Sequence, residues 1–135
     1  MSTNYHDTFI QVAEDCPVDR GEAPPVRAAS PTAAQLQFEL LSAAPYTMTS
    51  DDLLFAVHAL RHGIAQEERE RERSAFFARS QACLRASPLP KRYGWGLHHD
   101  DRGRVALVAS GTPEYAQLAA DPAIAQVRAM RSSRR

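Results

Sequence analysis

The chain has 135 residues, of which 44% are hydrophobic and 24% are charged, values typical of a globular protein rather than a disordered one. Its 16 Lys and Arg residues balance 16 Asp and Glu residues, and a formal net charge of zero argues against a generally basic nucleic-acid-binding protein. No apolar run reaches the length of a membrane span, so we expect a single soluble domain over residues 1–135.

The first part of the chain predicts a short strand followed by a long irregular segment. Residues 8–13 (TFIQVA) mix β-branched and aromatic residues with partial alternation, which is typical of a strand. Residues 14–29 contain three prolines and a glycine, which disfavour a helix. We therefore expect a long loop that is either functional or packed onto the domain as an arm.

Three helices are predicted in the middle of the chain. Ser30 followed by Pro31 combines a side-chain cap with a proline in the first turn. The run Thr-Ser-Asp-Asp at 49–52 provides a capping hydroxyl and two carboxylates that complement a helix N-terminus. The run QEERERER at 66–73 places opposite charges three or four residues apart, which indicates a solvated helix. The three predicted helices span 31–43, 50–63 and 66–80.

Two more helices are predicted near the C-terminus, each opened by a capping residue and a proline. The pairs are Thr112-Pro113 and Asp121-Pro122. The arginines toward the end of the chain complement the negative end of the last helix, which is a sufficient structural reason for them. The two helices are expected over 113–120 and 122–131, and a basic tail over 132–135.

A β-hairpin is predicted around the turn Asp-Asp-Arg-Gly at 100–103. Strand-like runs over 93–99 and 104–109 flank this turn, and its glycine suits the left-handed end of a hairpin loop. A four-residue loop pairs Leu97 with Ala106, whereas a three-residue loop pairs Leu97 with Leu107. The two registers differ by one residue, so the side chains of one strand that share a face with the other strand are exchanged between them.

We favour the three-residue loop because it sorts the side chains into two distinct faces. The large apolar side chains then share one face: Tyr93, Trp95, Leu97, Val105 and Leu107. The opposite face is nearly bare: Gly94, Gly96, His98, Ala106 and Val108. Glycine inside a strand indicates that something approaches the backbone closely, either a covering helix or a ligand.

These elements predict an α+β fold. A small antiparallel sheet is expected to be built on the 93–109 hairpin and joined by the 82–87 segment and the N-terminal strand. Four to five helices would pack around it.

A candidate ligand site follows from the bare face and from the segment RASPLPKR at 85–92. Two prolines make this segment stiff and extended, and its Arg, Ser, Lys and Arg side chains form a fair clamp for a phosphate or carboxylate. An ordinary exposed basic loop is the alternative interpretation. The proposed ligand-binding residues are Arg85, Ser87, Lys91, Arg92, Gly94, Gly96 and His98.

The motifs of several enzyme classes are absent from the sequence. There is no nucleotide-binding glycine loop and no paired C-x-x-C or H-E-x-x-H, so we expect no cofactor and no metal. His58 and His62 have a usable ligand spacing without an acidic partner on that helix face. An enzyme would need His98 as base beside an acidic residue or a thiol, namely Asp51, Asp52 or Cys83.

Cellular location is indicated by the cysteines and the N-terminus. Cys16 and Cys83 fit no disulfide framework, and residues 1–10 lack a signal-peptide profile. We therefore expect a cytoplasmic protein with reduced thiols.

The chain resembles a small family of bacterial proteins of unknown function. The resemblance rests on four stretches: NYHDTFIQVAEDCP at 4–17, PYTMTSDDLLFAVHALR at 45–61, CLRASPLPKRYGWGLHHDDRGRVAL at 83–107 and VRAMRS at 127–132. It covers nearly the whole chain and implies neither an activity nor catalytic residues.

Our first hypothesis is a small binding module for an anionic small molecule or nucleotide. Arg85, Lys91 and Arg92 would hold the anion, and Tyr93 or Trp95 could stack on a base. The neutral charge favours a small ligand over a long nucleic-acid duplex. The alternatives are a structural or interaction protein that forms a homodimer, and then a small enzyme that uses His98.

Overall fold

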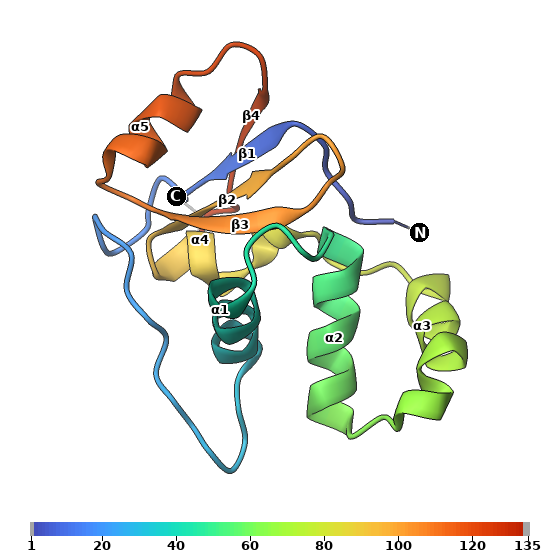
Figure 1. The fold of residues 1–135 in the computed structure, drawn as a ribbon. Helices are drawn as coiled ribbons and strands as arrows, with labels where there is room; N and C mark the ends of the chain where they lie inside the picture. The colour runs from blue at the N-terminus through green and yellow to red at the C-terminus, as the bar shows by residue number, and fades with distance from the viewer. Residues whose placement is uncertain (1, 134–135) are drawn as a thin grey trace.

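The computed structural model describes residues 2–133 as a mixed four-stranded sheet with helices on both faces (Figure 1). The fold is therefore α+β, as the sequence predicts. The strands are β1 (Thr8–Gln11), β2 (Trp95–His99), β3 (Val105–Ala109) and β4 (Ala125–Arg128). The α-helices are α1 (Ala33–Ala43), α2 (Ser50–His62), α3 (Arg69–Ala78), α4 (Pro88–Arg92) and α5 (Pro113–Ala119). Two 3₁₀ turns, η1 (Gln66–Glu68) and η2 (Leu84–Ala86), precede α3 and α4.

The sheet has the strand order β3-β2-β1-β4. β1 is antiparallel to β2 but parallel to β4, so the expectation of a wholly antiparallel sheet is wrong. The parallel pair arises because the chain returns past α5 before it reaches the free edge of β1, and such a return needs a long connection rather than a tight hairpin.

The β2–β3 hairpin has the register that the three-residue loop predicts. Trp95 is opposite Ala109, and Leu97 is opposite Leu107. The carbonyl of Asp100 accepts the N–H of Gly103 at 3.0 Å, and Gly103 has a φ of 79°, the left-handed conformation that glycine adopts without strain. The face assignment is confirmed for the strand residues, but Tyr93 and Gly94 precede β2 and are not part of it.

The main hydrophobic core lies between one face of the sheet and the helices α1, α2 and α4 (Figure 1). Each of these elements, and η2, contributes fully buried apolar side chains. They include Ile10, Leu41, Leu53, Leu84, Leu89, Leu97 and Val105. The opposite face of the sheet is covered by α5, so the protein has a helix–sheet–helix layering.

Helix starts follow the predicted capping chemistry closely. The Thr49 hydroxyl accepts the N–H of Asp52 at 3.1 Å, and the Asp52 carboxylate accepts the N–H of Thr49 at 3.0 Å, which completes a capping box for α2. For α1 the cap is Thr32 rather than Ser30, because Thr32 is the hydroxyl residue whose oxygen reaches the N–H of Gln35.

The predicted helix over 122–131 is wrong, and residues 125–128 form β4. The carboxylate of Asp121 accepts the N–H of Ala123, which makes a local turn instead of a helix start. The N–H groups of Ala125 and Ala129 then donate to carbonyls of the N-terminal strand region, at 2.8 and 2.9 Å. The unpaired edge of β1 therefore overrides the helical spacing of the apolar residues.

The segment at 82–92 also differs from its prediction. Residues 84–86 form η2 and do not join the sheet, and 88–92 form the short helix α4 rather than an extended loop. Pro88 and Pro90 are compatible with this helix because they lie in its first turn, where the missing N–H groups have no intrahelical partner. The Ser87 hydroxyl caps α4 by accepting the N–H of Leu89.

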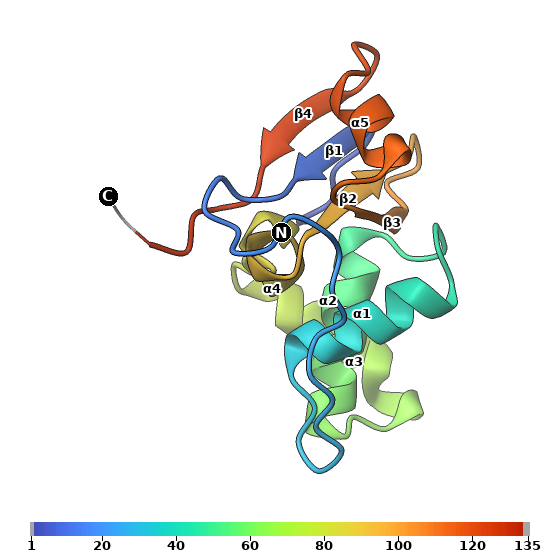
Figure 2. The same ribbon diagram turned by 90° about the vertical axis from the view of Figure 1, so that its left-hand side faces the viewer.

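The segment over 14–29 contains neither helix nor strand, and part of it packs against the domain as an arm (Figure 2). The N–H of Glu22 donates to the carbonyl of Tyr93 at 2.8 Å, and Gly21 lies against the Trp95 ring. Asp15, at the start of this segment, accepts the N–H groups of Ser132 and Ser133 near the C-terminus. Residues 134–135 of the predicted basic tail lie outside the described residues.

Candidate functional site

The structure separates the residues of the predicted anion clamp. Arg85 donates from Nε to the carbonyl of Arg128 at 2.6 Å, so its guanidinium ties η2 to the end of β4. The Ser87 hydroxyl is buried and donates to Gln37 Oε1 at 2.6 Å. Both side chains therefore have structural partners, and neither lines a pocket with Lys91 and Arg92.

The two glycines of the bare face are covered by the protein itself. A Cβ added at Gly96 would lie 2.6 Å from the Phe9 ring and 2.8 Å from the Tyr115 ring. Gly94 has a φ of 77°, and a Cβ there would lie 2.0 Å from the carbonyl oxygen of Arg20. A helix and the arm therefore occupy the positions at which the ligand hypothesis placed a ligand, and the covering-helix interpretation holds for Gly96.

His98 has a hydrogen-bonding partner that the sequence did not indicate. The Tyr46 hydroxyl lies 2.8 Å from His98 Nδ1. Partial burial lowers the pKa of His98, although Asp100, Asp121 and Asp7 oppose the effect, and burial raises the pKa of Tyr46. Both shifts favour the neutral forms of the imidazole and the phenol, which meet beside the inner strand β2.

The partners that an enzyme hypothesis assigned to His98 are engaged elsewhere. Asp51 accepts the N–H and the hydroxyl of Thr3, both at 2.7 Å. The sulfur of Cys83 accepts the Tyr5 hydroxyl at 3.3 Å. Asp52 is part of the capping box described above. These contacts account for all three groups structurally.

Lys91 and Arg92 do share a pocket, which we call the basic pocket. It has a volume of about 310 Å³ and lies between the end of α4 and the start of α1. Its lining residues are Thr32, Ala33, Ala34, Pro88, Lys91, Arg92 and Tyr93. Within residues 2–133, neither cation forms an ion pair.

The start of α1 adds hydrogen-bond donors to the basic pocket. The first N–H groups of a helix have no intrahelical partner, and the Thr32 hydroxyl already accepts that of Gln35. Ala33 and Ala34, the first two residues of α1, line the pocket at the positive end of the helix dipole. The sequence indicated Lys91 and Arg92 as ligand-binding residues. It could not indicate Thr32 as a residue of the same pocket, because only the fold brings α1 beside α4.

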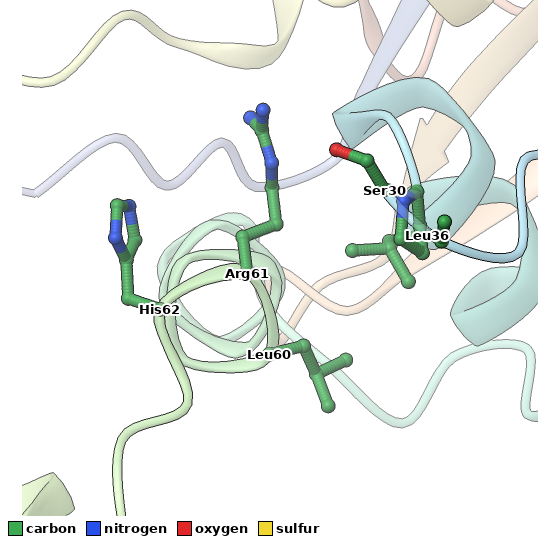
Figure 3. Close-up of a pocket in the computed structure, with 7 residues that line it drawn as sticks. Ser30, Leu36, Leu60, Arg61 and His62 are labelled. Atoms are coloured by element: carbon green, nitrogen blue, oxygen red, sulfur yellow. The ribbon is translucent and has the colours of Figure 1, made fainter.

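A larger pocket, of about 470 Å³, lies between the segment before α1 and the end of α2 (Figure 3). Arg61 and Leu60 extend from α2, with Ser30 and Leu36 on the facing side, while His62 projects beside Arg61 away from them. The sequence missed this pocket because it is assembled from two helix ends that are distant in the chain. With one cation facing Ser30, it offers less charge to a ligand than the basic pocket does.

The described residues contain neither a clustered set of metal ligands nor a membrane-spanning helix. No group of three or more His, Cys, Asp or Glu side chains in residues 2–133 is arranged to hold a metal ion. Within the same range, every helix is too short or too polar to cross a bilayer.

The fold and its pockets define a small α+β protein with a basic pocket between α1 and α4. The chain belongs to a family of unknown function, DUF6157, whose model matches residues 1–135. Comparisons with curated proteins and with solved structures gave no match.

Proposed function

We propose that the protein is a binding module for an anionic small molecule, with a nucleotide as the favoured ligand class. The observation that carries the proposal is the convergence of Lys91, Arg92 and the start of α1 on the basic pocket. Proteins hold phosphate and carboxylate groups with basic side chains and with helix N-termini. The basic pocket brings both kinds of group together.

The size and chemistry of the pocket support a small ligand. A volume of about 310 Å³ is at the lower end of the range for small-molecule sites. Tyr93 lines the same pocket and offers an aromatic ring on which a base can stack. Trp95 is engaged instead with the arm, since its Nε1 donates to the carbonyl of Glu22. We therefore assign the stacking role to Tyr93.

We also infer a cytoplasmic location. Both cysteines are free, and each is partly buried rather than paired in a disulfide. Proteins of oxidising compartments more often use such residues as disulfides.

The proposal is tested by titrating the full chain with adenosine monophosphate, inorganic phosphate and adenosine, followed by amide NMR shifts. Adenosine monophosphate is expected to shift the amides of 32–34 and 91–93, and to bind more weakly as salt is raised. Adenosine, which lacks the charge, is expected to bind at least about tenfold more weakly.

The matched variants are K91Q/R92Q and the control R102Q, an exposed arginine in the β2–β3 turn. The double variant is expected to lose about tenfold or more in affinity for adenosine monophosphate, while the control retains wild-type affinity. Equal binding of adenosine and adenosine monophosphate, or wild-type affinity in K91Q/R92Q, would overturn the proposal.

A further inference from the structure

A second pocket has the opposite electrostatic character from the basic pocket. It lies at the outer edge of the sheet, where β3, α5 and the loop between α1 and α2 meet, and its volume is about 440 Å³. We call it the acidic pocket. We propose that it binds a small organic cation, namely an alkyl or arylalkyl ammonium compound, independently of the proposed function at the basic pocket.

The apolar part of the acidic pocket suits a hydrocarbon body. Residues 106–108 of β3 and Leu118 of α5 line it, and Pro45 adds a further apolar surface. Ligand pockets of this volume generally combine such an apolar lining with a few polar groups that orient the ligand. The apolar lining therefore provides the binding energy for a body of several carbon atoms.

The charged groups that line the acidic pocket are both carboxylates. Glu114 lies in the first turn of α5, and Asp121 lies in the turn that follows this helix. No lysine, arginine or histidine is among the lining residues. Within residues 2–133 neither carboxylate forms an ion pair. One oxygen of Asp121 accepts the N–H of Ala123, which orients this side chain. Charge complementarity thus selects a cation over a neutral or anionic ligand.

Tyr46 gives the acidic pocket a fixed aromatic wall. Its φ of 57° is uncommon for a residue other than glycine. Two contacts hold it: its N–H donates to the carbonyl of Val105 at 3.0 Å, and its hydroxyl pairs with His98. Aromatic rings attract ammonium groups, so Tyr46 complements the two carboxylates. Through its Nδ1, His98 holds the Tyr46 hydroxyl and so supports this wall of the pocket.

The experiment compares hexylamine, hexanol and hexanoate, three probes with the same hydrocarbon chain, by amide NMR on the full chain. Hexylamine, as its ammonium ion, is expected to shift the amides of 106–108 and α5. Hexanol is expected to bind about tenfold more weakly, and hexanoate more weakly still. Equal affinity for hexylamine and hexanol, or shifts that lie elsewhere in the chain, would overturn the proposal.

Two variants and one control separate charge recognition from folding. E114Q/D121N removes both charges but keeps the side-chain oxygens, and it should bind hexylamine and hexanol alike. Q117K places an ammonium group three residues after Glu114 on α5, in the pocket that Asp121 also lines, so it should pair with these carboxylates and block hexylamine. D101N, in the exposed hairpin turn, should behave as the wild type. If Q117K and E114Q/D121N retain the wild-type preference for hexylamine, the carboxylates do not recognise the ligand and the proposal fails.

Discussion

The fully buried histidine of β2 makes the stability of the protein dependent on pH. His99 has no exposed surface, and neither ring nitrogen has a hydrogen-bond partner within residues 2–133. Its ring packs edge-on against Tyr5, with 5.3 Å between the ring centroids. Burial lowers the pKa of His99 from 6.5 to about 4, and nearby backbone groups of Leu97 and Thr8 offset only part of this effect.

The sign of the effect follows from which state binds the proton first. As the pH falls below 6.5, the imidazole is protonated in the unfolded chain but not in the folded one, so the free energy of unfolding decreases. The decrease ends near pH 4, where the folded state also binds the proton. The full span between these values corresponds to about 3 kcal/mol, a large part of the stability of a small domain.

The perturbation that isolates this effect is H99F, which keeps an aromatic ring against Tyr5. Between about pH 7.5 and about pH 5, protonation of His99 in the unfolded chain should remove about 2 kcal/mol from the wild type. H99F should lack this part of the decrease. His58 and His98, whose pKa values burial also lowers, contribute equally to both proteins, so the difference between them reports on His99.

The assay is urea unfolding followed by circular dichroism at several pH values. The control H62Q removes an exposed histidine at the end of α2 and should retain most of the wild-type decrease. If H99F loses as much stability on acidification as the wild type, the buried imidazole is not the cause and the reasoning is refuted.

Two further substitutions test the packing and the caps. G96A should lower the free energy of unfolding by about 1–3 kcal/mol, because its methyl group would overlap the rings of Phe9 and Tyr115; chemical denaturation measures this, and an unchanged stability would contradict the close packing. T49A should lower the free energy of unfolding by about 1 kcal/mol, because it breaks the capping box with Asp52. Thermal unfolding followed by helical circular dichroism should then show a lower midpoint, and an unchanged midpoint would show that the cap contributes nothing.

Much of the fold was predictable because local chemistry decides it. The capping residues around Thr49 and the left-handed exit at Gly63 fix α2 from within a few residues. The hairpin register followed from sorting large and small side chains onto two faces, and Leu97 opposite Leu107 confirms it. These signals act within one element or between neighbours in the sequence, so they determine the local structure with little influence from the rest of the fold.

The wrong predictions depend on partners that are remote in the sequence. Asp121-Pro122 has the same local chemistry as Thr112-Pro113, yet only Thr112 starts a helix, because the free edge of β1 captures residues 125–128 as a strand. Prediction of the site is limited by the same dependence on residues that are remote in the sequence. Lys91 could be selected by its charge, but the sequence does not indicate that α1 begins beside it.

The zero net charge of the chain conceals two local fields of opposite sign. Lys91 and Arg92 lie beside α1 under one face of the sheet, while Glu114 and Asp121 belong to the layer of α5 over the other (Figure 1). Exposed charges interact over only about a Debye length, about 8 Å at physiological salt, so a small ligand responds chiefly to the charges that line its own pocket. The balanced composition therefore argues against a long polyanion, which must contact many cations at once, but it does not bear on small ligands that meet one pocket at a time.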